Sequence, residues 1–273
     1  MKFCDSIAAL AYRRLAPALY ASVLAGGLLA PCAVRADDAK ADPSVANTLK
    51  KRIFKTGDVN HYKLSMKSQV AGADNSVTIT FKETTKDAKA DGQFTLLDEF
   101  ESAMANIMGA DQDISSFLPT ITVVRDKDGK LSNKTEGGIE QAAAQISPVM
   151  QQIATIQEAF LPKTPVKVGD KWKVTVTAPG PDGAGAKHDG EATLLGTEVI
   201  GGIKSVKLKV SSDVDANDAK VHNESLLNLD PETGKLLKIS AKVDGTSGGM
   251  KITQELEMSL VPAEKKADAP DKK

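Results

Sequence analysis

The sequence has few aromatic residues, few cysteines and almost no net charge. Aromatic side chains make up 4% of the 273 residues, and 35 Lys and Arg are balanced by 36 Asp and Glu, for a formal net charge of −1. A near-neutral chain lacks the basic footprint of nucleic-acid-binding proteins, so we expect no nucleic-acid partner. The hydrophobic content of 41% is enough for a core and excludes wholesale disorder.

Both cysteines, Cys4 and Cys32, lie in an N-terminal stretch that has the pattern of a secretory signal. Basic residues precede an apolar run over 15–34, and Val34-Arg35-Ala36 provides small or branched residues at the −3 and −1 positions of a cleavage site. We therefore predict a signal peptide over 1–36 and an exported protein, periplasmic or extracellular, with no membrane span and no disulfide after cleavage. An uncleaved membrane anchor, or a lipid anchor on an acylated Cys32, is the alternative.

The rest of the chain divides into one folded region and two polar flanks. Segments 37–48 and 263–273 lack periodicity, and we predict a disordered linker and a disordered tail there. The stretch between them, 49–262, is predicted to be a single β-rich domain. Removing 1–36 takes away four basic residues and one acidic residue, which leaves 31 basic and 35 acidic side chains and a net charge of −4. This charge favours solubility.

Alternation of apolar and polar residues dominates this domain and predicts strands with one face on a core and the other in water. Turn signals at Asp128-Gly129, Gly201-Gly202 and Asp230–Gly234 separate successive strands. We count about ten or eleven strands, mostly joined to their nearest neighbours as an antiparallel meander. The clearest apolar series are Tyr62, Leu64, Met66 and Val70; Val77, Ile79 and Phe81; Trp172, Val174 and Val176; Val206, Leu208 and Val210; and Ile252, Leu256, Met258 and Leu260.

One segment changes to a helical period. Between Ile139 and Phe160, apolar residues recur every three or four positions, and Ser147-Pro148 predicts either a kinked helix or two short ones, over about 138–146 and 148–160. Another short helix is expected over 98–108. The predicted fold class is mainly β with α (α+β), an antiparallel, curved, half-barrel-like sheet around a kinked helix. A two-sheet sandwich is the alternative.

Motifs that carry chemistry are sparse. The stretch 245–249 (GTSGG) matches the G-x-S-x-G motif of serine hydrolases, but a strand-like run follows it and no histidine comes after it, so we interpret it as a hairpin turn. His61, His188 and His222 stand alone, which leaves a zinc site unsupported. We therefore expect a protein that is not an enzyme and has no cofactor.

The segment 213–224 comes close to an EF-hand calcium loop. Position 6 of that loop requires glycine but holds Asp218 here, and the flanking residues are strand-like. We interpret the segment as a solvated hairpin and expect no metal site. The oxygen-bearing residues at positions 1, 3, 5 and 12 are Asp213, Asp215, Asn217 and Glu224.

The stretch Phe160–Trp172 runs FLPKTPVKVGDKW, a helix end followed by a Pro-rich link, a Gly-Asp turn and a Trp-led strand. Its P-V-x-V-G-D-x-W portion resembles a signature of uncharacterised exported bacterial proteins and lipoproteins. The layout of the chain is more loosely similar to periplasmic lipoprotein carriers, whose half-barrel is covered by helices and holds acyl chains on its concave face. This resemblance implies binding rather than catalysis. On physical grounds, Trp172 is expected to be a core anchor.

Two functions remain open. The first is an envelope protein that binds a lipid or other apolar ligand between the concave face and the helix. The alternative is a structural or interaction domain of the envelope with a filled core and no ligand. A stripe of Ile and Met serves either purpose. The residues predicted to contact a ligand are Met104, Met108, Ile146, Met150 and Ile153.

Overall fold

The computed structural model describes residues 49–70, 73–107, 109–178, 186–216, 219–247 and 250–262. The predicted signal peptide, linker and tail lie outside these ranges. No helix within them is long and apolar enough to cross a membrane. The elements are β1 (Val59–Val70), β2 (Ala73–Ala88), β3 (Phe94–Ile107), β4 (Ala110–Asp113), η1 (Ser115–Phe117), β5 (Thr120–Arg125), β6 (Leu131–Glu136), α2 (Glu140–Thr155), η2 (Ile156–Phe160), β7 (Lys171–Ala178), β8 (Ala186–Ile200), β9 (Ile203–Ala216), β10 (Ala219–Leu229), β11 (Leu236–Ser247) and β12 (Met250–Val261).

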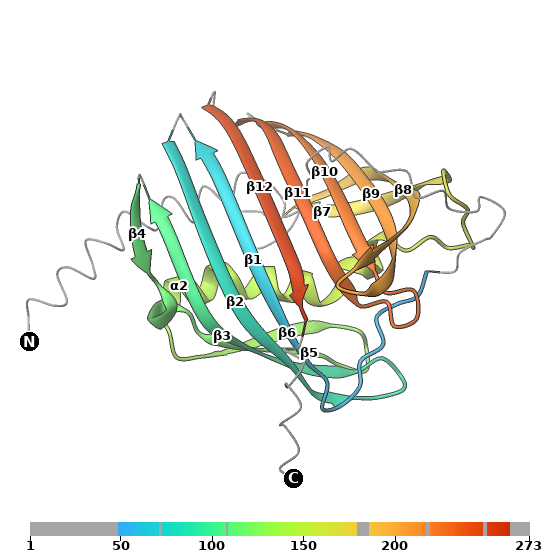
Figure 1. Cartoon of the computed structure of the whole chain (residues 1–273), viewed down its shortest axis with the longest axis horizontal. Coiled ribbons are helices and arrows are strands. Elements are labelled where there is room, and N and C mark those ends of the chain that lie inside the picture. The colour runs from blue at the N-terminus through green and yellow to red at the C-terminus, as the bar shows by residue number, and fades with distance from the viewer. Residues whose placement is uncertain are drawn as a thin grey trace, which may run out of the picture.

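All twelve described strands belong to one antiparallel sheet, as the α+β prediction expects and the sandwich alternative does not. The order is β6-β5-β3-β2-β1-β12-β11-β10-β9-β8-β7, with β4 paired to β3 off this path. Two meanders therefore meet where the first strand pairs with the last, so the N-terminal and C-terminal strands lie at the centre of the sheet. Figure 1 shows the sheet curving around α2 as an open half-barrel.

The helix lies on the concave side because of the chain's connectivity. The two edge strands are β6 and β7, and α2 with η2 is the connection between them, so the chain crosses the concave side from one edge to the other (Figure 1). We call the sheet surface that turns towards α2 the inner face. Asn133 on β6 holds the middle of α2 to this edge strand, because its Nδ2 donates to the carbonyl oxygen of Ser147 at 2.9 Å.

One helix prediction is wrong, and for a second the structure excludes one of the two alternatives. Residues 98–107 belong to β3, where buried Ala103 and Ala105 alternate with exposed Ser102 and Met104, a strand pattern. The stripe over 139–160 forms one α-helix through position 148, followed by η2, so two short helices are not what forms. Proline inside a helix removes one backbone hydrogen bond. The carbonyl that loses its partner belongs to Ala144, an exposed residue, where water can satisfy it.

The segment that precedes β1 crosses the end of the sheet and contacts the β10–β11 turn. The Ile53 N–H donates to the Thr233 carbonyl with an N···O distance of 2.7 Å. Gly234 in this turn has a φ of +66°, and a Cβ atom there would approach the Lys50 carbonyl oxygen to 2.5 Å. Only glycine tolerates both the positive φ and this close approach. The predicted turn at Asp230–Gly234 therefore also packs against the segment that precedes β1.

Candidate functional site

The inner face is built from rows of residues that the strand register aligns across the sheet. The row nearest the middle of the sheet is apolar on eight consecutive strands. All its members belong to the core cluster, by which we mean the buried apolar residues that pack together around Met150 and Ile153 of α2. Strand alternation explains this, because every second residue of each strand turns to the same face. The members of the row are Ala103, Ile79, Leu64, Met258, Ile239, Leu227, Leu208 and Leu194.

The structure separates the residues that were predicted to contact a ligand. Met150 and Ile153 of α2 are buried in the core cluster, at 2% and 9% exposure, and Ile146 is partly buried against it. Met104 lies on the opposite face of the sheet and is 45% exposed, so it is not brought together with the helix residues. Met108 lies outside the described residues. Next to α2, the inner face is therefore packed as a core.

A patch of neutral polar residues interrupts the apolar inner face further along the strands. Ser68 on β1 is directly opposite Gln254 on β12, and Asn223 on β10 is directly opposite Ser212 on β9, in the same row. Ser225 follows two residues after Asn223 on the same face, opposite Val210 and Ala241 of the core cluster. All five residues are buried. We call them the inner polar patch: Ser68, Ser212, Asn223, Ser225 and Gln254.

Two atoms of this patch have no hydrogen-bond partner. They are Oδ1 of Asn223 and Oγ of Ser225, in side chains that are 4% and 0% exposed. The amide nitrogen of Asn223 has one long contact, 3.4 Å, to Oγ of Ser212. Beyond the patch, apolar Val221 and Ile252 are buried but are not part of the core cluster around α2. The sequence signal for this patch was a gap at residue 68 and another at residue 254 in otherwise regular apolar series.

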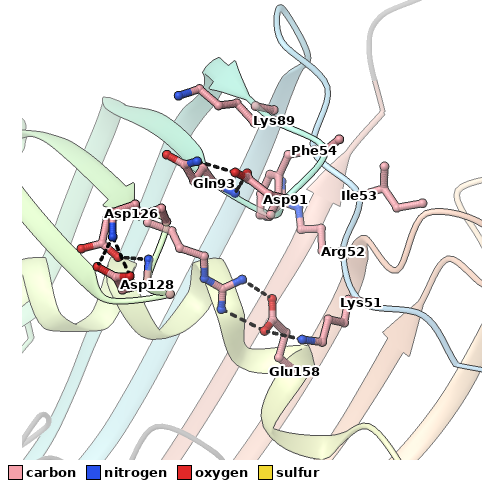
Figure 2. Close-up of a pocket in the computed structure, with 16 residues that line it drawn as sticks. Lys51, Arg52, Ile53, Phe54, Lys89, Asp91, Gln93, Asp126, Asp128 and Glu158 are labelled. Atoms are coloured by element: carbon pink, nitrogen blue, oxygen red, sulfur yellow. Dashed lines mark hydrogen bonds and ion pairs between the residues drawn. The ribbon is translucent and has the colours of Figure 1, made fainter.

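A second candidate is a polar pocket of about 690 Å³ at the end of the sheet where the β2–β3 and β5–β6 turns lie. Several of its charged groups already have partners. Arg125 donates to both carboxylate oxygens of Glu158, at 2.7 and 2.9 Å, and Figure 2 shows Lys51 on the other side of the same carboxylate. Asp126 accepts hydrogen bonds from the backbone N–H groups of Asp128 and Lys130. These contacts join η2 to the β5–β6 hairpin and to the segment before β1.

Behind the pocket lies a buried ionic cluster that sequence reasoning missed. Arg52, from the segment before β1, donates to both carboxylate oxygens of Glu83, and the two side chains are each 3% exposed. Asn60 donates to the same carboxylate at 3.1 Å, and Asp98 is opposite Glu83 on β3. Burial lowers the pKa of Arg52 and the Glu83 carboxylate raises it, with a net upward shift. Glu83 and Asp98 lie at inward-facing positions of their strands. An acidic residue at such a position was the sequence signal for this cluster.

Asp98 is the residue of this cluster whose buried carboxyl group lacks a full set of partners. Burial, followed by the neighbouring Glu83 carboxylate, raises the pKa of Asp98 well above its ordinary value, while Arg52 acts in the opposite direction. Its Oδ1 has no hydrogen-bond partner. Two acidic side chains therefore share one cation inside the protein. An aromatic stack supports that cation, because the Arg52 guanidinium lies 4.5 Å from the Phe54 ring centroid, and Phe54 packs on Phe94 at 4.3 Å.

The residues of the P-V-x-V-G-D-x-W stretch have structural partners. Asp170 accepts a hydrogen bond from the Lys167 N–H at 2.8 Å, which closes the Gly-Asp turn. Gly169 has a φ of +92°, and its N–H donates to the Leu194 carbonyl at 2.8 Å. The indole N–H of Trp172 donates to the Phe160 carbonyl at 3.0 Å and joins η2 to β7. Trp172 packs against the core cluster, as its anchor role predicts.

The two other motifs lie on hairpins. Residues 245–247 end β11 and residue 250 begins its antiparallel partner β12, as the hairpin interpretation of 245–249 predicts. Asp213 and Asp215 lie on β9 and Glu224 on β10, while Asn217 lies outside the described residues. Their carboxylates are paired with His222, Lys220 and Lys209 in turn. No group of three or more His, Cys, Asp or Glu in the described ranges is placed to hold a metal ion.

The sequence matches no protein-family model and no curated protein. Among solved structures, the chain aligns with lipovitellin, described for its lipid–protein interactions, with a TM-score of 0.46 and 9% identity over 79% of this chain. The alignment spans 27% of lipovitellin's length. The hypothetical lipoprotein YmcC from Escherichia coli aligns with a TM-score of 0.27 and 10% identity, over 73% of this chain and 87% of that one. A DUF1329 family protein from Desulfovibrio piger aligns with a TM-score of 0.21 and 12% identity, over 79% and 90%. At these scores the likenesses carry no inference about this chain's ligand.

Proposed function

We propose that this chain is a non-catalytic envelope protein that binds an apolar ligand on the inner face of its sheet. The observation that carries the proposal is the size of that face relative to its helix. Eleven strands lie side by side on the sheet path, which makes the sheet roughly 50 Å across, and a strand of 12 residues extends about 40 Å. The 16 residues of α2 form a rod of about 24 Å by 10 Å.

A rod of this size covers a stripe of the inner face, and further along the strands lie apolar residues that are buried without being part of the cluster around α2. Val221 and Ile252 are such residues, as is Val243 in the row of the inner polar patch, and none of the three belongs to the cluster around α2. Because burying apolar surface is the main favourable term in protein association, such a face is suited to an apolar ligand. The part of the face packed by Met150 and Ile153 is core, so the ligand is expected further along the strands.

Binding is tested by native mass spectrometry of protein purified from its own host, together with titration of the apolar dye N-phenyl-1-naphthylamine and its displacement by oleate. We expect a co-purified small molecule and a displaceable dye signal. Val243→Thr, which changes shape little, should weaken dye binding several-fold, whereas Val199→Thr on a strand residue that is 67% exposed should not. An empty mass spectrum and no dye signal would instead support the structural domain with a filled core.

The envelope location rests on the pattern of residues 1–36. N-terminal sequencing of the exported protein should give Asp37 as the first residue. A lipid-modified start at Cys32 would support the anchored alternative, and an intact Met1 would contradict export by cleavage.

A further inference from the structure

The inner polar patch is unexpected in an apolar binding face. Nearly all buried polar groups in folded proteins have a hydrogen-bond partner, and a buried one that lacks a partner destabilises the fold. Asn223 Oδ1 and Ser225 Oγ both lack one and lie in side chains that are 4% and 0% exposed. Both belong to β10, two residues apart, and both are on the inner face. A pair of such atoms on a proposed binding face is suited to a group that the ligand supplies.

We propose that Asn223 and Ser225 bind a neutral hydrogen-bonding group, a hydroxyl or a secondary amide, carried within the length of an otherwise apolar ligand. This inference rests on the proposed function and names the class of ligand. Asn223 Oδ1 accepts hydrogen bonds, so the ligand must donate one, and Ser225 Oγ can donate as well as accept. A hydroxyl or a secondary amide can both donate and accept a hydrogen bond. Such a group therefore also fits the orientation in which the nitrogen and oxygen of the Asn223 amide exchange places.

The chemistry of the patch argues against a charged head group. All five members are uncharged, and a carboxylate or phosphate offers only acceptor oxygens to the Asn223 carbonyl oxygen. Burying such an anion without a cationic partner is far more costly than burying a hydroxyl. Arg52, a buried cation that lines the polar pocket, already has Glu83 as its partner.

The position of the patch along the strands places the polar group inside the ligand's length. On one side of Ser225 lies the apolar row that includes Leu227 and Leu208. On the other side of Asn223 lie Val221 and Ile252, which are also buried. Apolar residues on both sides are suited to hydrocarbon on both sides of the ligand's polar group.

The same strand region contains a matched pair on the outer face. Asn228 and Ser205 are as buried as Asn223 and Ser225, at 3% and 0% exposure, but both have partners. Asn228 Nδ2 donates to Glu198 Oε1 at 2.6 Å and to Ser205 Oγ at 3.1 Å, and Ser205 Oγ donates to the Glu198 carbonyl at 2.9 Å. Asn228 and Ser205 therefore show the pairing that buried Asn and Ser side chains make on the outer face of these strands, whereas Asn223 Oδ1 and Ser225 Oγ on the inner face have no such partner.

The test compares two neutral probes that differ by one mid-chain hydroxyl, methyl 12-hydroxystearate and methyl stearate. Each is used to displace N-phenyl-1-naphthylamine from the full chain, from Ser225→Ala and Asn223→Leu, and from the control Ser205→Ala. We expect the unaltered chain to prefer the hydroxylated ester by about tenfold, the effect of one to two net hydrogen bonds. Ser225→Ala and Asn223→Leu should lose this preference and still bind methyl stearate. Ser205→Ala should keep it.

Urea unfolding of the same variants gives a second readout. Ser225→Ala removes an unpaired buried hydroxyl and should not lower the midpoint, whereas Ser205→Ala breaks two hydrogen bonds and should lower it. Equal affinity of the unaltered chain for both esters would overturn this inference and leave the proposed function standing. Absence of dye binding and of displacement by either ester would overturn both.

Discussion

The buried pair of Arg52 and Glu83 allows a quantitative prediction. Replacing Arg52 with Met keeps a long apolar side chain near Phe54 but leaves Glu83 without its cation. Removing one partner of a buried ion pair typically costs about 3–5 kcal/mol, because the remaining charge stays buried. Loss of the guanidinium from the Phe54 ring adds about 0.5–1 kcal/mol. We therefore expect Arg52→Met to lower the free energy of unfolding by about 5 kcal/mol at neutral pH.

Arg125 provides the matched control for this substitution. It also donates twice to a glutamate, Glu158, and its guanidinium lies 5.4 Å from the Phe94 ring centroid. Its side chain is 18% exposed, against 3% for Arg52. Water therefore stabilises the partner that is left behind, and Arg125→Met should cost only about 1 kcal/mol.

The assay is urea unfolding followed by circular dichroism at pH 8 and at pH 5. The deficit of Arg52→Met should be smaller at the lower pH, because protonation of Asp98, whose pKa is raised, removes one of the two acidic charges that share this site. The double variant Arg52→Met, Glu83→Gln should recover part of the loss. Equal losses of unfolding free energy for Arg52→Met and Arg125→Met would refute the argument that deeper burial makes breaking the Arg52–Glu83 pair more destabilising.

Three further predictions concern the core and its edges. Ile153→Ala should lower the unfolding free energy by roughly 2–5 kcal/mol and Ile146→Ala by less, because Ile153 is 9% exposed and Ile146 only partly buried; urea titration of both variants measures the difference, and equal losses would contradict core packing at Ile153. Asp98→Asn should make stability less dependent on pH and raise it at neutral pH. Since folding raises the pKa of Asp98, native Asp98 stabilises the fold below the ordinary pKa of about 4 and loses that contribution as the pH rises through the native value; pH-resolved unfolding that leaves both proteins parallel would contradict this. Trp172→Phe removes the hydrogen bond to the Phe160 carbonyl and should cost about 1 kcal/mol, measured by circular dichroism because the chain has a single Trp; an unchanged midpoint would show that this bond does not hold η2 to β7.

The fold was largely predictable because period two is a local signal. The series Tyr62, Leu64 and Met66 is such a signal, and the structure places these residues on the inner face of β1. The error at 98–108 has a physical origin in the same rule. The inward positions of β3 there are occupied by Ala103 and Ala105, small residues that fit a strand or a helix equally by size. The β1–β12 pairing, which closes the gap between the two meanders, joins residues almost 200 positions apart and has no local signature.

The candidate site was less predictable because it depends on register between strands. In β1 the apolar series skips Ser68, and in β12 it skips Gln254, and each gap on its own resembles ordinary variation. Only the pairing of Ser68 with Gln254 and of Asn223 with Ser212 shows that the interruptions fall in one row. A one-residue slip of any of these strands would have turned its polar side chain to the outer face. Because every strand keeps the register that buries its apolar neighbours, the polar side chains are held inward by the same packing, and Asn223 and Ser225 keep unpaired atoms that a ligand group can satisfy.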